Sequence, residues 1–192
     1  MELVTGGAGF IGSHLVDALV AQGKRVRVLD NFSSGREEFL AHHGEQVEVV
    51  RADLLDLDAT KVAMEGVETV HHMAANPDIR LGTEVTDTDL RQGTVATYNV
   101  LEAMRSAGVS RISFSSSSAI YGEADVMPTP ETYGPIKPIS LYGASKLASE
   151  GLISAWCGTF GAKSWIHRFA NIVGPRGTHG VIFDFIHKLK AD

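Results

Sequence analysis

Six short apolar runs are spaced along the chain, and they are rich in β-branched and aromatic residues. They cover residues 3–4, 26–29, 47–50, 67–70, 111–114 and 164–166. This composition is typical of strands buried in a sheet. The pattern therefore predicts six strands.

Between the runs lie segments in which apolar residues recur every three or four positions, the period of a helix. Residues 11–20 show this spacing most clearly, with Gly23 as a natural stop, and residues 89–106, 141–160 and 181–190 resemble them. Strand and helix alternate, so the sequence predicts a doubly wound parallel α/β sheet of the Rossmann type, with helices on both faces. Four prolines within residues 127–138 indicate an ordered surface loop.

Composition excludes several classes of protein. The 192 residues are 44% apolar and 21% charged, as in a globular domain, and the net charge is −6. An acidic chain argues against non-specific nucleic-acid binding, which needs Lys and Arg to neutralise phosphates. The single cysteine, Cys157, excludes an intrachain disulfide and fits a reducing, cytoplasmic compartment. No apolar run approaches the length of a membrane span, so no membrane partner and no signal peptide are expected.

A glycine-rich turn lies between the first predicted strand and the first predicted helix. Gly6, Gly9 and Gly12 recur every three residues, and Phe10 and Ile11 lie within the turn. Such glycines let the backbone approach a pyrophosphate, while the helix N-terminus directs free N–H groups and a positive dipole end at it. The alternative is a turn needed only for close packing of the strand on the helix.

An aspartate at the right spacing favours dinucleotide binding. Asp30 ends the second apolar run, 18 residues after Gly12, where its carboxylate can accept hydrogen bonds from an adenine ribose. The alternative is a solvated turn carboxylate. The negative charge of Asp30 would repel a 2′-phosphate, so NAD is expected in preference to NADP. Arg36 lies near enough to soften that preference.

Two more strand ends carry candidate cofactor contacts. Asp53 and Leu54 follow the third run, where the carboxylate could accept the adenine amino group or, alternatively, act as a helix N-cap. The small residues Ala74 and Ala75 follow the fourth run and would let a cofactor lie across the strand ends. The alternative for these alanines is close packing under a loop.

A tyrosine and a lysine lie four residues apart, on one face of a predicted helix. Lys146 would stabilise the phenolate of Tyr142 and lower its pKa from about 10, so that the tyrosine could remove a proton from a substrate hydroxyl. Serines at residues 115–118 directly follow the fifth run, where catalytic groups collect in parallel sheets. Taken singly, the pair reads equally well as an exposed amphipathic pair, and the serines read better as a polar turn.

Five segments, taken in order, resemble one family. They are residues 5–12, 30–35, 115–122, 142–146 and 168–175. The chain is similar to the extended short-chain dehydrogenase/reductase family, and within it to NAD-dependent sugar-nucleotide epimerases typified by UDP-glucose 4-epimerase, an isomerase of galactose metabolism.

The resemblance implies roles for particular residues. It makes Ser117 the catalytic serine, Tyr142 the base and Lys146 its helper, with Ser117, Tyr142 and Asn171 contacting the substrate. It places the cofactor against a wider set, namely Gly6, Gly9, Phe10, Ile11, Gly12, Asp30, Asn31, Ser33, Ser34, Gly35, Asp53, Leu54, Ala74, Ala75, Ser115, Tyr142 and Lys146. The reaction implied is transient oxidation at C4 of a UDP-sugar, with return of the hydride to the other face.

The sequence departs from the family in three places. Relatives that dehydrate sugar nucleotides have an acidic pair where this chain has serines, so a 4,6-dehydratase is disfavoured. Residues 89–92 lack the asparagines usual before the Gly-Thr pair, so no cofactor contact is assigned there. Family members also continue into a smaller domain. We therefore expect residues 1–170 to be the NAD-binding domain and residues 171–192 the start of a largely absent substrate region.

Alternatives to an epimerase follow from that length. They are a non-catalytic NAD-binding module, a truncated remnant, or another extended short-chain dehydrogenase. The expected partners are a nucleotide sugar and a second copy of the chain. No metal is expected, because the adjacent histidines His42–His43 and His71–His72 would point apart on strands and could not both ligate one ion.

Overall fold

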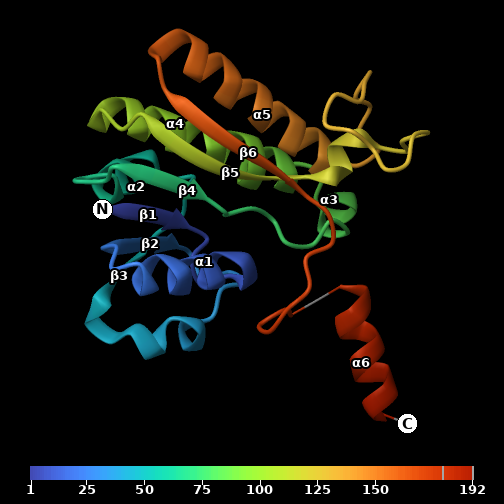
Figure 1. Cartoon of the computed structure of the whole chain (residues 1–192), viewed down its shortest axis with the longest axis horizontal. Coiled ribbons are helices and arrows are strands. Elements are labelled where there is room, and N and C mark those ends of the chain that lie inside the picture. The colour runs from blue at the N-terminus through green and yellow to red at the C-terminus, as the bar shows by residue number, and fades with distance from the viewer. Residues whose placement is uncertain (179, 192) are drawn as a thin grey trace.

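The computed structural model describes residues 1–178 and 180–191, and its centre is one parallel sheet (Figure 1). Its strands run in the spatial order β3-β2-β1-β4-β5-β6. They are β1 (Glu2–Thr5), β2 (Val26–Asp30), β3 (Val47–Arg51), β4 (Thr69–His72), β5 (Arg111–Ser117) and β6 (Lys163–Phe169). The strand order reverses between β1 and β4, which is where ligands bind in open α/β sheets.

Helices and short helical turns connect the strands. The α-helices are α1 (Phe10–Ala21), α2 (Leu57–Ala63), α3 (Leu81–Glu84), α4 (Ala96–Ala107), α5 (Leu141–Phe160) and α6 (Val181–Ala191). The 3-10 turns are η1 (Glu37–Phe39), η2 (Ala41–Gln46) and η4 (Ser118–Tyr121), and η3 (Leu90–Val95) is a π-helical segment. No described helix is long and apolar enough to cross a membrane.

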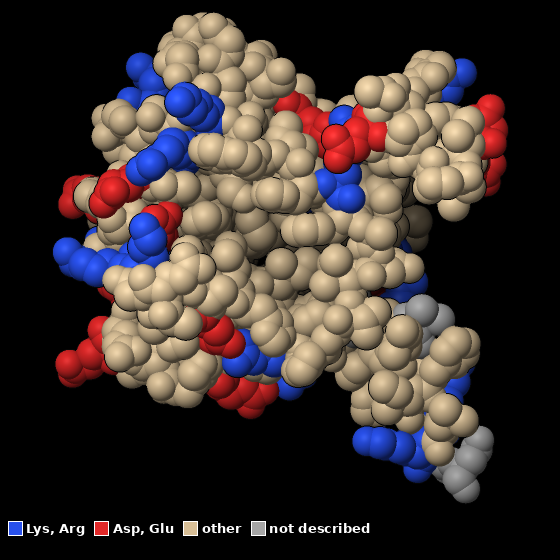
Figure 2. Space-filling model, in the orientation of Figure 1, with Lys and Arg blue, Asp and Glu red and all other residues tan. Residues whose placement is uncertain are grey.

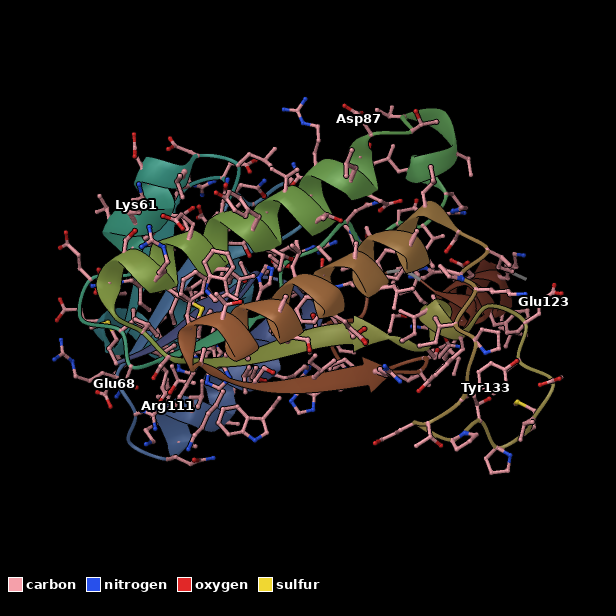
Figure 3. The ribbon with its side chains drawn as sticks, turned by 90° about the horizontal axis from the view of Figure 1, so that it is seen from above. Lys61, Glu68, Asp87, Arg111, Glu123 and Tyr133 are labelled. Atoms are coloured by element: carbon pink, nitrogen blue, oxygen red, sulfur yellow. The ribbon has the colours of Figure 1, made fainter. Side chains whose placement is uncertain are left out.

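Alternate residues of each strand enter two separate cores, because successive side chains point to opposite faces. Leu3 packs in one core with residues of α2, α4 and α5, whereas its neighbour Val4 packs in the other with Val16 and Leu19 of α1. Helices α4 and α5 lie side by side over one face (Figure 3). The predicted doubly wound sheet with helices on both faces is confirmed.

The fourth strand begins two residues later than its apolar run predicts. Val67 closes the turn after α2 through a hydrogen bond from its N–H to the Met64 carbonyl. Glu68 donates its N–H to the Met1 carbonyl, so pairing with β1 in the sheet register starts at Thr69. The strand therefore includes His71 and His72, which the hydrophobic pattern alone does not indicate.

The predicted helix over residues 89–106 is confirmed, but its first turn is wider than an α-helix. Residues of η3 form a π-helical turn that continues into α4. The side of this turn lies against α5, where a Cβ on Gly93 would come within 2.7 Å of Ser145 Oγ. A bulge of this kind often marks a functional site, and it lies opposite the helix that carries Tyr142.

A buried ion pair joins α5 to β6 and to the proline-rich loop. Arg168 donates Nε to Glu150 Oε1 at 3.1 Å and Nη2 to Oε2 at 2.9 Å, and Ser116 also donates to Glu150. The same guanidinium binds the Tyr121 hydroxyl and the Glu131 carbonyl, both at 2.9 Å. This network fixes the loop of residues 122–140 beside the N-terminus of α5.

Glu150→Ala is expected to lower the free energy of unfolding by roughly 2 kcal/mol, because it removes the carboxylate partner of a guanidinium whose side chain is 24% exposed. Glu38→Ala is the matched control. Glu38 pairs with Arg36 at 3.2 Å with both side chains more than half exposed, so its loss should cost less than about 1 kcal/mol. Urea unfolding measures both values. Equal losses would show that the buried pair does not support the loop.

Candidate active site

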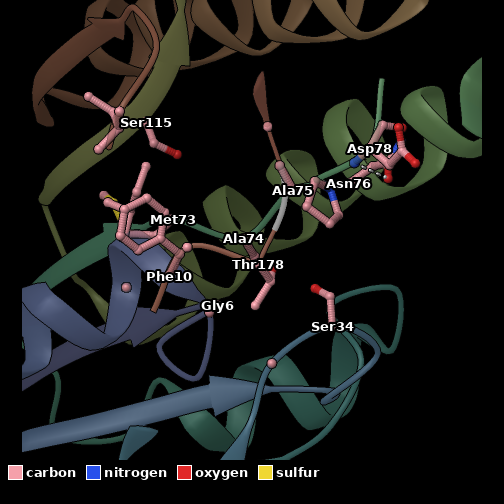
Figure 4. Close-up of a pocket in the computed structure, with 18 of the residues that line it drawn as sticks. Gly6, Phe10, Ser34, Met73, Ala74, Ala75, Asn76, Asp78, Ser115 and Thr178 are labelled. Atoms are coloured by element: carbon pink, nitrogen blue, oxygen red, sulfur yellow. Dashed lines mark hydrogen bonds between the residues drawn. The ribbon is translucent and has the colours of Figure 1, made fainter. Parts of the chain in front are cut away.

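A cleft of about 1040 Å³ opens at the carboxyl ends of the strands, at the point where the strand order reverses. Figure 2 shows the surface hollowed between the loop before α5 and α6. The cleft is lined by every residue that the sequence predicts as a site residue: Gly6, Gly9, Phe10, Ile11, Gly12, Asp30, Asn31, Ser33, Ser34, Gly35, Asp53, Leu54, Ala74, Ala75, Ser115, Ser117, Tyr142, Lys146 and Asn171. The structure thus brings together segments that are far apart in the sequence (Figure 4).

The glycine turn is built so that no side chain can enter it. Gly6 has φ +67°, and a Cβ there would lie 2.7 Å from the Ala74 backbone. A Cβ on Gly12 would lie 2.1 Å from the Gly6 carbonyl oxygen. Close packing, the alternative reason for the glycines, is therefore sufficient to require glycine at both positions.

The same turn leaves the start of α1 uncapped. The N-cap residue, Gly9, makes no side-chain hydrogen bond to the helix, and the first turn carries no acidic residue. The positive end of the helix dipole is therefore not neutralised by the protein at this point of the cleft. An anionic group such as a pyrophosphate fits there.

Asp30 is held in place by backbone donors. Its Oδ2 accepts the Ala8 N–H at 2.9 Å and its Oδ1 accepts the Phe32 N–H at 2.8 Å, and the residue is 8% exposed. Asp30 is therefore not a solvated turn carboxylate. Each oxygen keeps further lone pairs, and a Cβ on Gly35 would lie only 3.0 Å from Oδ1, so Gly35 leaves the carboxylate open to a ligand.

Asp53 does not cap the helix that follows. Asp56 caps α2 by accepting the Ala59 N–H at 3.0 Å. Asp53 instead accepts the Leu55 N–H at 2.8 Å and the Asn31 amide at 2.9 Å, which joins the ends of β2 and β3. The N-cap alternative is therefore wrong, and the carboxylate stays on the wall of the cleft.

Ser117 and Tyr142 lie close together at the carboxyl end of β5. The Ser117 hydroxyl accepts the Ala119 N–H at 3.1 Å, which begins η4, and it lies near enough to the Tyr142 phenol to lower the pKa of that phenol. Ser140 caps α5 by accepting the Gly143 N–H at 3.0 Å, which sets where the helix starts and hence where Tyr142 lies. The two hydroxyls can contact one substrate oxygen together.

Lys146 lies one turn further along α5 and is 3% exposed. Its Nζ donates to the Ser115 carbonyl at 2.6 Å and lies 5.7 Å from the centre of the Tyr142 ring. Burial lowers the pKa of Lys146 to about 8, although the charge of Asp89 acts the other way. The side chain of Ser115 bonds the His72 carbonyl instead of facing the cleft through its hydroxyl.

The expected activation of Tyr142 by Lys146 is wrong for the ligand-free protein. Burial raises the pKa of Tyr142 above its usual value, the Ser117 hydrogen bond lowers it by less, and Asp89 raises it further. The Lys146 ammonium donates to the Ser115 carbonyl, and it is not among the groups that shift the pKa of Tyr142. The tyrosine is thus a neutral phenol until something else in the cleft favours its ionised form.

The Tyr142 phenol is expected to titrate above pH 10 in the ligand-free protein, because burial disfavours the phenolate. The chain has four tyrosines, so the phenolate absorbance of Tyr142→Phe is subtracted from that of the wild type. Tyr98→Phe, at a site that is 45% exposed, is the control. A Tyr142 midpoint at or below pH 10 would contradict the assignment.

The segment after β6 closes one side of the cleft and was only partly anticipated. Asn171 lies on it and is exposed to the cleft, as the resemblance implies. Further along, a Cβ on Gly174 would lie 3.5 Å from the Phe10 ring, and the Pro175 carbonyl lies 2.9 Å from His14 Nε2. Gln92 of η3 also lines the cleft, although the missing asparagines argued against a contact from that helix.

The expectation that both histidine pairs lie on strands is wrong for His42 and His43. They lie in η2, with ring centres 3.9 Å apart, and both Nε2 atoms contact Asp17 Oδ1. The expectation is confirmed for the other pair, since His72 binds Thr5 and Thr97 in the core whereas His71 binds Glu2.

Comparison with known proteins matches the chain to one family. A sequence model of the NAD dependent epimerase/dehydratase family matches residues 2–192. A curated UDP-glucose 4-epimerase from Mycolicibacterium smegmatis is 37% identical over 197 residues, which cover 98% of this chain and 63% of that protein.

Solved structures agree. A crystal structure of a UDP-galactose 4-epimerase has a TM-score of 0.91 at 49% identity, covering 100% of this chain and 63% of that one. A Thermus thermophilus UDP-glucose 4-epimerase in complex with NAD has a TM-score of 0.87 at 38% identity, covering 93% and 58%. The chain therefore spans less than two thirds of the length of these relatives.

Proposed function

The chain belongs to the NAD dependent epimerase/dehydratase family, and on that premise we propose that its cleft binds NAD and interconverts UDP-sugars at C4. One observation carries the proposal. An uncapped helix N-terminus, a buried Asp30 and the Ser117–Tyr142–Lys146 group all line a single cleft. The relatives named UDP-glucose and UDP-galactose 4-epimerase supply the substrate class.

The residues present fit a dinucleotide. The start of α1 would hold the pyrophosphate, Asp30 the adenine ribose, and Asp53 with Asn31 the adenine. Ala74 and Ala75 leave room between the two halves of the sheet. The chemistry that bound NAD supplies is acceptance and return of a hydride.

The protein's own residues handle the proton. Tyr142 accepts the proton of the sugar 4-hydroxyl and later gives it back, while Ser117 hydrogen-bonds the same oxygen. This direction of transfer requires the phenolate, which a cation close to the ring would favour. Lys146 would supply this charge from the same helix face once its ammonium leaves the Ser115 carbonyl, and Asn171 would meet the diphosphate.

NAD is expected to bind more tightly than NADP, because Asp30 would repel a 2′-phosphate. Asp30→Ala should reduce the difference in binding free energy between NAD and NADP by ~1–3 kcal/mol, because it removes that repulsion and a hydrogen bond to the ribose. Calorimetric titration of both cofactors tests this. Asp58→Ala, which removes a carboxylate that is 96% exposed on α2, should leave this difference unchanged. Equal affinities in the wild type would refute the cofactor assignment.

Assembly and location belong to the proposal as well. Tyr98 of α4 meets Trp156 of α5 edge to face at 6.3 Å, yet Tyr98 and Phe160 are each about half exposed. We infer that a second copy covers this aromatic face, which sedimentation velocity would reveal.

A cytoplasmic location is supported by the single cysteine and by a cofactor of the NAD type.

A further inference from the structure

Two histidines and an aspartate converge on one point outside the cleft. His42 Nε2 and His43 Nε2 lie 3.0 Å and 2.7 Å from Asp17 Oδ1. The candidate ligand atoms of these three residues all lie within 4.8 Å of one another. The residues come from α1 and η2, more than twenty positions apart in the sequence. Nothing in the proposed reaction uses them.

The spacing of these atoms is that of the ligands around a metal ion. With metal–ligand distances of about 2.1 Å, neighbouring ligands lie about 3.0–3.4 Å apart in octahedral or tetrahedral geometry. The two Nε2–Oδ1 distances lie at the lower end of that range or just below it. An ion would take the place of the hydrogen-bonded protons, and the three ligand atoms, which already lie within 4.8 Å of one another, would move apart until each is about 2.1 Å from it.

The chemistry of the donors selects a class of ion. Two imidazoles and one carboxylate suit zinc and neighbouring divalent transition metals, and they do not suit magnesium or calcium, which prefer all-oxygen sites. Three protein ligands leave at least one position for water. We propose that Asp17, His42 and His43 form a binding site for a divalent transition-metal ion of the zinc type.

The surroundings allow an ion to enter. The His42 side chain is 49% exposed and provides a path from solvent, whereas His43 is 8% exposed and fixed. Adjacent histidines can share an ion here because η2 is a tight helical turn, with the two rings tilted by 40° and their centres 3.9 Å apart. On a strand they would point to opposite faces.

One positive charge opposes the ion. Arg176 Nη1 lies 2.8 Å from the other carboxylate oxygen, Asp17 Oδ2. The two carboxylate oxygens of Asp17 therefore face different partners, with Oδ1 toward the histidines and Oδ2 toward Arg176. An ion at Oδ1 leaves the Arg176 pair at Oδ2 in place. Removal of the guanidinium charge should tighten metal binding.

Bound metal would tie α1 to η2. The loop that leads into η2 carries Ser33–Gly35, which line the adenosine end of the cleft. The ion would thus act as a clamp on the half of the sheet that faces the adenosine. The effect on the adenosine end rests on the proposed function, whereas metal binding itself is measured without NAD or sugar.

The test is calorimetric titration of the untagged protein with zinc, with cobalt absorption as a report of the ligands. We expect one equivalent to bind, with a rise in Tm. His43→Ala and Asp17→Asn should each weaken binding by at least about tenfold, as for loss of a ligand from a three-residue site. Arg176→Gln should strengthen it.

Two controls keep the proposal falsifiable. His42→Gln removes one of the proposed ligands and should therefore weaken zinc binding. Because the side chain is exposed, this variant is the least able to disturb folding, and its circular dichroism spectrum should be unchanged. His167→Ala removes a histidine of β6 that bonds Ser113 of β5, and this variant should bind zinc as the wild type does. If the wild type bound no stoichiometric zinc, or if the His42, His43 and Asp17 variants bound zinc as tightly as the wild type, the three residues would form a hydrogen-bonded cluster and no metal site.

Discussion

Tyr142→Phe is expected to slow reduction of NAD by a UDP-sugar by roughly 10²–10⁴-fold, the usual contribution of a general base. The phenol oxygen is the group that exchanges the 4-hydroxyl proton, and phenylalanine keeps the ring and its packing on α5. NAD affinity should change little, because the pyrophosphate and adenosine residues lie on other elements. The rate is followed by the absorbance of reduced NAD, with protein in excess over sugar.

The matched control is Tyr133→Phe, on the loop before α5. Tyr133 lies edge to face with Tyr121 at 6.0 Å and does not line the cleft, so its loss should leave the rate unchanged. If Tyr142→Phe reacted at the wild-type rate, the proton would be leaving by another route. A loss of NAD binding in the same variant would instead indicate that the ring supports the cofactor.

Lys146→Met is expected to reduce both NAD affinity and rate, each by at least about tenfold, because it removes a cation worth more than 1.4 kcal/mol to its partners. Methionine nearly preserves the volume, so packing is retained. The wild-type activity should fall as the pH rises through about 8, where the buried ammonium loses its proton. Rate and calorimetric affinity against pH measure both effects.

The same group predicts a pH dependence of stability. The pKa of Lys146 is lowered from 10.5 in the unfolded chain to about 8 in the folded one. Between these values the unfolded state binds more protons, so this group stabilises the fold increasingly as pH rises from about 8 to about 10.5. Lys146→Met should lose that dependence. A wild-type contribution of opposite sign would place the lysine outside the core.

Much of the cleft could be predicted because its signals are local. The glycine turn, Asp30 and the Tyr142–Lys146 pair depend on spacing within one strand–helix unit, and the parallel sheet then brings the strand ends together. The helix over residues 141–160 has the same ends in the structure as in the sequence prediction. Its N-cap, Ser140, provides a physical reason for the start.

Features that depend on contacts between distant segments could not be read from the sequence. The start of β4 is set by a hydrogen bond from Glu68 to Met1, and the wide turn of η3 accommodates Ser145 of α5. The raised pKa of Tyr142 follows from burial, which no spacing reveals. The rings of His42 and His43 converge because both residues lie in the helical turn η2, which the hydrophobic pattern does not predict.

The most direct test of the central claim, that one cleft joins NAD to the Tyr142 group, is transfer of an isotope. The protein is incubated with NAD and with UDP-galactose deuterated at C4, and the cofactor is recovered for mass spectrometry. We predict deuterium on the reduced cofactor when the wild type is quenched before the hydride returns, and none from Tyr142→Phe. Because a completed reaction leaves NAD unlabelled, the sugar is analysed as well. A wild type that binds NAD but yields neither deuterated reduced cofactor nor UDP-glucose deuterated at C4 would contradict the account, because the cleft would then bind the cofactor without performing its chemistry.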